Sequence, residues 1–240
     1  MKWETLRETY RKIVKRYEVA NFLITWGHVD RWRREAVGLL YLHTPLKILD
    51  AGAGPGNMAR HFGDIKYVVA LDLTPEMLKT NGNADDKVVG VFEQMPFRSQ
   101  SFDVVCAGYS LHAAVDIERA VGEFSRVASY HVVVSIGKPD NKILRGLLYI
   151  YVKYVVPTLV RLVTSRDTSM EYRKIYDIIK SIPINSVTKK IIERYTSHLI
   201  FRERGLGAVY IYVAKSAVSK SRCNTGRILN NAFRAQHRRL

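Results

Sequence analysis

Residues 46–57 read LKILDAGAGPGN. A short apolar run ends at Asp50, and glycines then stand at alternate positions, 52, 54 and 56. Glycines at this spacing let a backbone turn sharply and approach a ligand closely, because they have no Cβ. A helix that starts directly after such a turn presents free N–H groups to the ligand. The stretch therefore predicts a strand that ends in a ligand-binding turn.

The chain on either side of this stretch predicts an α/β fold. Further apolar runs follow at 67–73, 87–92, 101–109 and 130–136, and segments with helical character separate them at 57–62, 75–79 and 116–128. Continuous apolar strands that alternate with helices are typical of a mostly parallel sheet covered on both faces. Residues 198–203 and 208–215 read as two late strands joined by a turn at Gly205–Gly207, whereas 1–45 and 141–182 read as mostly helical.

Asp72 ends the second run, twenty residues after Gly52. A carboxylate at this place can accept both ribose hydroxyls of a nucleoside. A dinucleotide fingerprint would need glycine at position 57, where the chain has Asn57, and Pro55 removes an N–H that a phosphate would bind. The loop therefore favours an adenosine that carries a sulfonium amino acid over a nicotinamide dinucleotide, and a turn without a ligand is the remaining alternative.

Three later segments resemble the successive motifs of class I S-adenosylmethionine (SAM) dependent methyltransferases. They are DLTPEML at 72–78, FEQMPF at 92–97 and SFDVV at 101–105. The flanks at 17–34 and 154–183 resemble the ubiquinone/menaquinone biosynthesis C-methyltransferases, so that the resemblance covers about residues 10–215. It implies a Rossmann-like domain over 1–215. Its parts would be a helical cap (1–45), a SAM-binding core (46–140), a helical acceptor-side insert (141–197) and the final strands (198–215), followed by a basic tail (216–240).

The resemblance and the glycine loop together imply two sets of binding residues. The SAM-binding set is Asp50, Gly52, Ala53, Gly54, Gly56, Asp72, Leu73, Met77, Phe92 and Glu93. The acceptor-binding set is Tyr17, Asn21, Trp32, Tyr172 and Arg173. The chain departs from the family at Val91, where many relatives have Asp, at 109–114, near the usual Arg-Asn pair, and at 203–205, where Asn-Leu-Thr is usual.

A ring-carbon acceptor needs a general base, because its hydroxyl must lose a proton before the carbon becomes nucleophilic. His112 follows the strand at 101–109, at the edge of the sheet where ligands of open α/β folds lie, and is the first candidate for this base. Tyr109 is the second candidate catalytic residue, as a wall of the pocket or a hydrogen-bond partner of the acceptor. The alternatives are an exposed or helix-capping histidine and a packed aromatic ring.

The formal charge of +16 is distributed unevenly along the chain. Residues 1–45, 46–140, 141–215 and 216–240 carry net charges of +4, −3, +9 and +6. The positive charge therefore lies on the acceptor side and the tail, which favours an anionic membrane surface over RNA as a partner. Residues 144–163 combine an apolar face with cations and are expected to cover the site, either as an interfacial lid or as a buried core helix.

The remaining sequence features exclude several classes of protein. The N-terminus has no secretory signal pattern, the longest apolar stretch is interrupted by charges, and neither the two cysteines nor any other cluster forms a metal site. We therefore expect a cytoplasmic protein without a metal, and association with the cytoplasmic face of a membrane stays open. The leading hypothesis is a SAM-dependent C-methyltransferase acting on a demethylated prenylquinone such as demethylmenaquinone. A methyltransferase on another small aromatic or lipid acceptor or on RNA, and a catalytically silent SAM-binding protein, are the alternatives.

Overall fold

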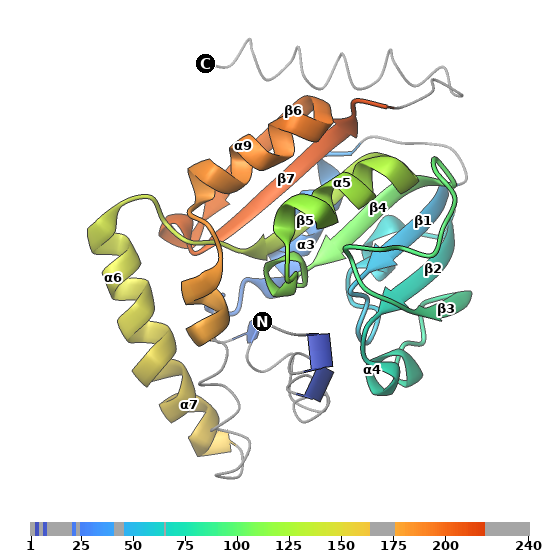
Figure 1. The fold of residues 1–240 in the computed structure, drawn as a ribbon. Coiled ribbons are helices and arrows are strands. Elements are labelled where there is room, and N and C mark those ends of the chain that lie inside the picture. The colour runs from blue at the N-terminus through green and yellow to red at the C-terminus, as the bar shows by residue number, and fades with distance from the viewer. Residues whose placement is uncertain are drawn as a thin grey trace.

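The computed structural model describes residues 3–4, 7–8, 21–22, 25–40, 46–64, 66–163 and 176–218. In this part of the chain, one twisted sheet forms the centre of the molecule (Figure 1). Its strand order is β3-β2-β1-β4-β5-β7-β6. The strands are β1 (Leu46–Ala51), β2 (Lys66–Asp72), β3 (Asp86–Val89), β4 (Phe102–Gly108), β5 (Ala128–Ile136), β6 (Thr196–Arg204) and β7 (Val209–Ser216).

The first five strands are parallel, and β7 runs antiparallel between β5 and β6. The order reverses at β1, which pairs with β2 on one side and with β4 on the other. Ligands of open α/β sheets bind at the carboxyl ends of the strands where the order reverses. This topology confirms the predicted Rossmann-like sheet and places a candidate site beside the glycine loop.

Helices cover both faces of the sheet. They are α3 (Val29–Gly38), the 3-10 turn η2 (Ala59–Phe62), α4 (Pro75–Lys79), the 3-10 turn η3 (Leu111–Ala113), α5 (Ile117–Val127), α6 (Lys142–Ile150), the π-turn η4 (Tyr151–Val155), α7 (Val156–Val163), α9 (Asn185–Tyr195) and the 3-10 turn η5 (Gly205–Gly207). A further helical segment spans 176–181.

Alternate residues of the strands form two separate cores. Ile48 of β1 packs with α3 and with the inner side of α6 and η4, whereas its neighbour Leu49 packs with α5 and α9 on the other face. Both strand residues are fully buried. The near-continuous apolar strands are therefore explained by burial on both faces.

The observed elements differ from the predicted ones in three places. The predicted helix at 57–62 is a turn followed by η2, and Gly63, at φ 75°, ends that short segment. The strand predicted at 87–92 stops at Val89, before Gly90. β7 extends through Ser216, one residue beyond the expected end of the strands, and the rest of the predicted tail, from 219 on, lies outside the described residues.

The helix α6 begins at Asn141, whose side chain accepts hydrogen bonds from the backbone N–H groups of Ile143 and Leu144. It continues through η4 into α7 along one side of the molecule, on the left of Figure 1. Pro157 is the second residue of α7, and its missing N–H removes a regular helical hydrogen bond, as is usual at such irregular turns. Within the described ranges, no helix is long and apolar enough to cross a membrane.

Candidate active site

A cleft opens at the carboxyl ends of β1, β2 and β4. It holds about 660 Å³ of space free of protein atoms, part of which is open to solvent. Its lining comes from four stretches of chain and from one N-terminal residue: Gly52, Gly54, Leu71–Thr74, Met77, Gly90–Glu93, Ser110, Ala113–Val115 and Trp3.

The glycine loop forms one wall of the cleft, and the absence of a side chain has a different consequence at each glycine. Gly52, at φ 66°, packs against the neighbouring loop, because an added Cβ would lie 2.4 Å from Ser110 Cβ. Gly54, at φ 50°, faces open space, because an added Cβ would meet no atom within 4 Å. Gly54 is buried but lines the cleft, and a side chain at this position would project into free space.

Two asparagines that the sequence interpretation missed hold this loop in place. Asn81 is buried and donates from Nδ2 to Gly54 O at 3.2 Å, and its Oδ1 accepts from Asn83 N at 3.0 Å. Asn83 Nδ2 donates in turn to Gly56 O at 3.1 Å. The sequence gives only a weak indication of this role, because Asn81-Gly82-Asn83 is a pattern typical of any turn.

Asp72 stands at the end of β2 with its carboxylate directed along the edge of the cleft. Its Oδ2 accepts from Gly54 N at 2.9 Å and its Oδ1 from Thr74 N at 2.8 Å. Burial raises the pKa of this carboxyl group, and the two N–H donors oppose that shift. A carboxylate has about four acceptor positions, so both oxygens can still accept from a ligand's hydroxyl groups.

Glu93 lines the cleft, and its carboxylate also accepts hydrogen bonds from neighbouring segments. Its Oε1 accepts from the backbone N–H groups of Val115 and Asp116 at 2.7 and 3.1 Å, and its Oε2 accepts from Trp3 Nε1 at 3.2 Å. Glu93 therefore ties three segments of the wall together.

Apolar side chains form the rest of this end of the cleft. Leu73, Met77 and Phe92 line it, and the Phe92 ring meets the Phe124 ring edge to face at 6.0 Å. Val91, which stands where many relatives have Asp, also lines the cleft. Such a wall suits a flat heterocyclic ring with few side-chain hydrogen bonds.

Three residues of the predicted SAM set are near the cleft without lining it. Asp50 is fully buried beneath the loop, its Oδ2 accepts from Ala59 N at 3.3 Å, and burial raises its pKa to about 7. Ala53 packs in a small core with Ala70 and Leu78. Gly56 lies against Asn81, where an added Cβ would be 2.5 Å from Oδ1.

A second pocket adjoins the cleft, and residues 113–115 line both. His112, Asp116, Ile117 and Glu118 line it on one side, and Ile178, Ser181–Pro183 and Ile191 on the other. The helical segment 176–181 and α9 therefore complete a space of mixed polar and apolar lining next to the cleft.

His112 is a buried residue of this second pocket. Its backbone N–H donates to Ser135 Oγ at 3.1 Å, and its ring Nδ1 lies 3.3 Å from the same oxygen, which leaves Nε2 as the other ring nitrogen. Burial lowers the pKa of His112 to about 4, so its imidazole is neutral at pH 7. Ser135, at the end of β5, orients this side chain and was missed by the sequence interpretation.

Tyr109 lines neither pocket. Its side chain is fully buried in the core beneath α3, and the Arg33 guanidinium lies 5.3 Å from its ring centroid. Its backbone is in the left-handed region, at φ 59°, and its N–H donates to Val134 O at 2.7 Å. The chain turns at Tyr109, and the buried Tyr109 side chain thereby supports the loop that carries His112.

The predicted acceptor residues are scattered. Tyr17, Tyr172 and Arg173 lie outside the described residues. Asn21 is buried, and its carbonyl accepts from Thr25 N at 3.0 Å. Trp32 lies on α3, where it stacks on His28 at 5.3 Å and lines a basic surface groove. The described structure brings neither Asn21 nor Trp32 into the cleft or the second pocket.

The cleft nevertheless collects seven of the ten residues predicted to bind SAM. They are Gly52, Gly54, Asp72, Leu73, Met77, Phe92 and Glu93. The open backbone at Gly54, the carboxylate of Asp72 and the apolar wall fit the ribose and the base of an adenosine. In the described part of the chain, His, Cys, Asp and Glu form no cluster of three or more that could hold a metal ion.

Comparison with known proteins identifies the family. Demethylmenaquinone methyltransferase of Bacteroides fragilis is 24% identical over 230 residues, which cover 89% of this chain and 93% of that protein. Its namesake in Thermus thermophilus is 29% identical over 196 residues, covering 76% and 88%. The crystal structure of a SAM-dependent methyltransferase of Thermotoga maritima superimposes with a TM-score of 0.62 at 15% identity, covering 87% of this chain and 99% of that one. The model of the ubiE/COQ5 methyltransferase family matches residues 1–214, and the chain therefore belongs to this family of SAM-dependent methyltransferases.

Proposed function

We propose that this enzyme transfers a methyl group from SAM to a ring carbon of a reduced, demethylated prenylquinone, such as the hydroquinone form of demethylmenaquinone. The observation that carries the proposal is the match of nearly the whole chain to a family whose relatives are named for demethylmenaquinone. The two adjoining pockets support it, because one suits the methyl donor and the other offers isoleucines for a ring and polar groups for its hydroxyls.

The donor is held by the residues of the cleft. Asp72 accepts the ribose hydroxyls, Gly54 lets the donor approach the loop closely because it has no side chain, and Leu73, Met77 and Phe92 surround the base. SAM supplies a methyl group on a sulfonium centre, whose departure as a neutral thioether needs no acid. The protein therefore has to hold donor and acceptor in line, an effect worth several kcal/mol, at best roughly 7–11.

The acceptor occupies the second pocket in this proposal. Residues 113–115 line both spaces, so that an acceptor in the second pocket would lie next to the donor. Ile178, Ile182 and Ile191 supply apolar contacts for the ring and the first part of a prenyl chain.

His112 is the proposed base. Its neutral imidazole can accept the hydroxyl proton of the hydroquinone at Nε2, while Ser135 holds Nδ1. An adjacent phenolate would raise the low pKa of the imidazole, because an opposite charge favours the protonated form. The ring carbon then forms its bond to the methyl group as the carbon–sulfur bond breaks, and the proton on that carbon passes to solvent as the aromatic ring is restored. Tyr109 positions the loop from below.

An acceptor screen tests the proposal. The full-length protein is incubated with methyl-labelled SAM and, in parallel, with a chemically reduced short-chain demethylmenaquinone, a simple catechol and transfer RNA. We expect label in the quinone alone. SAM binding by calorimetry without label in the quinone would refute the proposed acceptor, and label in the RNA that declines steeply with salt would favour the nucleic-acid alternative.

We also infer that the enzyme meets its acceptor at the surface of a membrane, because a prenylated quinone is dissolved in the bilayer. The excess of positive charge after residue 140 supports this inference.

A further inference from the structure

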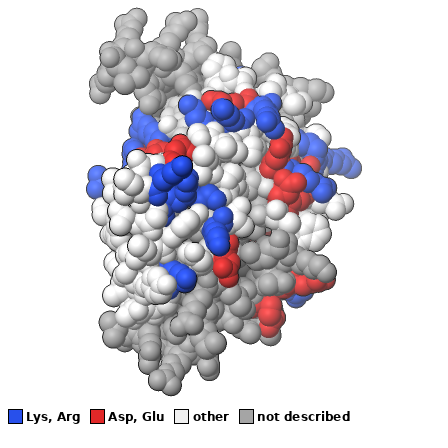
Figure 2. Space-filling model, turned by 60° about the vertical axis from the view of Figure 1, so that its left-hand side comes forward, with Lys and Arg blue, Asp and Glu red and all other residues white. Residues whose placement is uncertain are grey.

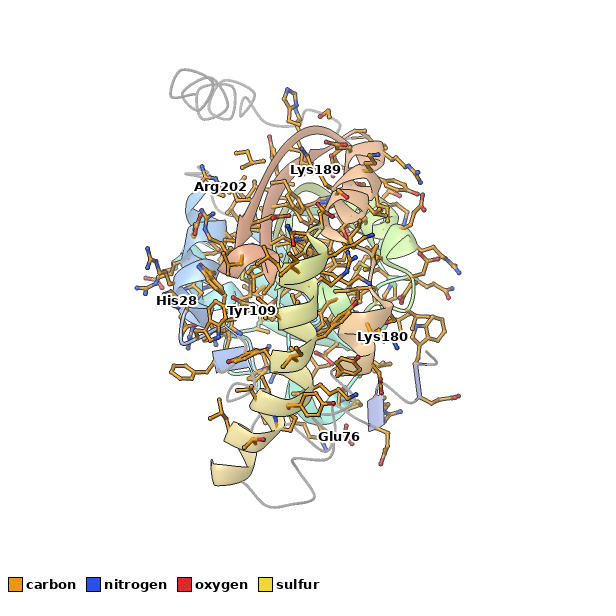
Figure 3. The ribbon with its side chains drawn as sticks, turned by 90° about the vertical axis from the view of Figure 1, so that its left-hand side faces the viewer. His28, Glu76, Tyr109, Lys180, Lys189 and Arg202 are labelled. Atoms are coloured by element: carbon orange, nitrogen blue, oxygen red, sulfur yellow. The ribbon has the colours of Figure 1, made fainter. Side chains whose placement is uncertain are left out.

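The surface beside the second pocket has an apolar stripe that faces solvent. Ile143, Leu147, Ile150 and Tyr154 lie four, three and four residues apart along α6 and η4, and each is more than half exposed. At about 3.6 residues per turn this spacing places them on one side of the helix. Figure 3 shows this helix running down the front of the molecule.

The stripe is distinct from the side of the same helix that packs on the protein. Leu148, Val152 and Val156 recur every four residues, are buried, and belong to the core beneath the sheet. The helix is therefore apolar on two opposite sides, and only the inner one is used within the described structure. A side of four large exposed apolar residues marks an interaction surface rather than scattered surface hydrophobics.

Aromatic residues extend the stripe to the neighbouring loops. Trp26 meets Tyr151 of η4 edge to face at 6.0 Å, and an added Cβ at Gly205 would lie 3.6 Å from Trp26 Cζ3. Leu206 follows Gly205 in the chain. The Phe22 ring packs on the turn that contains Trp26, because it lies 3.3 Å from the place of an added Cβ at Gly27. Trp26, Phe22 and Leu206 are each more than half exposed. Tryptophan and other aromatic side chains are enriched where proteins meet the bilayer interface.

Basic residues surround this surface. Lys142 and Lys153 are exposed on the flank of the helix. Next to Trp26, a shallow groove is lined by His28, Arg31, Trp32, Arg34, Glu35, Arg202 and Arg204. Figure 3 places His28 and Arg202 beside the helix, on its left. Glu35 pairs with Arg202 and Arg204, whereas the groove also contains Arg31 and Arg34, so that its net charge is positive.

We propose that these residues form a docking face for an anionic phospholipid bilayer. The docking face consists of the apolar set Ile143, Leu147, Ile150, Tyr154, Phe22, Trp26 and Leu206, and the basic set Lys142, Lys153, Arg31, Arg34, Arg202 and Arg204. The apolar set enters the boundary between headgroups and acyl chains, and the basic set binds the lipid phosphates. Figure 2 shows the part that α6 and α7 occupy, on the left, as a mostly uncharged area.

Charge complementarity selects a bilayer over a second copy of the chain. In a two-fold symmetric dimer the same patch meets itself, so that the arginines and lysines of both copies would come together. The one acidic residue of the groove, Glu35, is already paired. An anionic lipid surface satisfies both the apolar and the basic residues. The proposal extends the proposed function, since it brings the enzyme to a bilayer-dissolved acceptor, but its test does not need methyl transfer.

Vesicle co-sedimentation tests the docking face. The full-length protein is mixed with vesicles of phosphatidylcholine that contain about 30% phosphatidylglycerol, and separately with vesicles of pure phosphatidylcholine. We expect the parent to bind the anionic vesicles, and binding of the double variant Leu147→Gln/Ile150→Gln to be weaker by about tenfold or more. The matched control Val89→Gln/Val187→Gln changes two exposed valines elsewhere and should bind like the parent.

A second variant separates the basic set from the apolar one. Arg31→Gln/Arg34→Gln should bind anionic vesicles less tightly and with a smaller salt dependence, because two phosphate contacts are removed. Equal binding of the parent and the Leu147→Gln/Ile150→Gln variant, or no binding of the parent, would overturn the proposal. The proposal would also be overturned if the parent were a dimer and the Leu147→Gln/Ile150→Gln variant were a monomer. Activity on a water-soluble short-chain acceptor should be unchanged in both variants, which keeps a failure of docking distinct from a failure of the proposed function.

Discussion

At the scale of single residues, Asp72 is the group on which donor binding is proposed to depend. Asp72→Asn keeps the shape of the side chain and removes its charge. We expect SAM affinity to fall by about 10- to 100-fold, since a hydrogen bond to a charged group is worth about 1.5–3 kcal/mol. Isothermal titration calorimetry measures it, with Asp86→Asn on the exposed edge of β3 as the control. Unchanged affinity in a correctly folded variant would refute the ribose assignment.

For activation of the acceptor, the corresponding prediction concerns His112. His112→Gln should lower kcat by about 10²- to 10⁴-fold, the usual contribution of a general base. SAM affinity should stay that of the parent, because His112 lines the second pocket and not the cleft. The exposed His198→Gln is the matched control. Full activity of His112→Gln would remove His112 from the mechanism.

The position of His112 could be predicted from the sequence, but its environment could not. The apolar strand before it placed it at the carboxyl edge of the sheet. Its burial depends on Ser135 and on residues 178–183, which are 23 or more positions away. Tyr109 illustrates the same limit, because the left-handed backbone at this residue turns the side chain away from both pockets and into the core.

At the scale of elements, the glycine loop is held by the turn that follows α4. Asn81→Ala removes the hydrogen bonds to Gly54 O and from Asn83 N. We expect the free energy of unfolding to fall by about 1–3 kcal/mol, because buried partners are left unsatisfied, and SAM affinity to fall as well. Chemical denaturation and calorimetry measure the two effects. Thr80→Ala, one residue earlier, does not contact the loop and should preserve SAM affinity; equal effects of both variants would contradict this role.

The strands were predictable because burial on both faces leaves long apolar runs in the sequence. The helix predicted at 57–62 was wrong as a helix because Gly63 ends the segment after a single short turn. The asparagines were missed because their partners lie 27 residues away, a distance that local patterns do not report. The part of the site that depends on contacts between distant loops therefore required the structure.

At the scale of the whole molecule, stability should depend on the buried His131. Its Nε2 lies 3.2 Å from Ser125 Oγ and 3.1 Å from Ser216 Oγ, so it joins α5 and β5 to the end of β7. Burial lowers its pKa to about 3, from an ordinary value of 6.5. The unfolded chain therefore takes up a proton below pH 6.5 that the folded chain does not, and this residue's contribution to stability declines as the pH falls from 6.5 toward 3.

His131→Gln keeps a polar group near both serines and removes the titration. The difference in unfolding free energy between parent and variant should decline by a few kcal/mol over this pH range, at about 1.4 kcal/mol per pH unit at most. Asp50 and Asp72, whose pKa values are raised, act in the opposite direction but cancel in the difference. Denaturation curves at several pH values measure it, and a difference independent of pH would contradict the prediction.

The net charge of +16 is also a property of the whole molecule, and its distribution matters more than its sum. Residues 46–140, which contain most of the cleft, carry −3, whereas four arginines line the groove near Trp26. The excess positive charge therefore lies outside the donor-binding segment, and we propose that part of it faces the membrane that holds the acceptor.

The most direct test of the account is the structure of the product. The enzyme is supplied with SAM that carries a ¹³C-methyl group and with a reduced short-chain demethylmenaquinone, and the product is examined by NMR. The account predicts a single new methyl signal on a ring carbon. A signal from a methoxy group, or an unmodified quinone in the presence of enzyme that binds SAM, would contradict it.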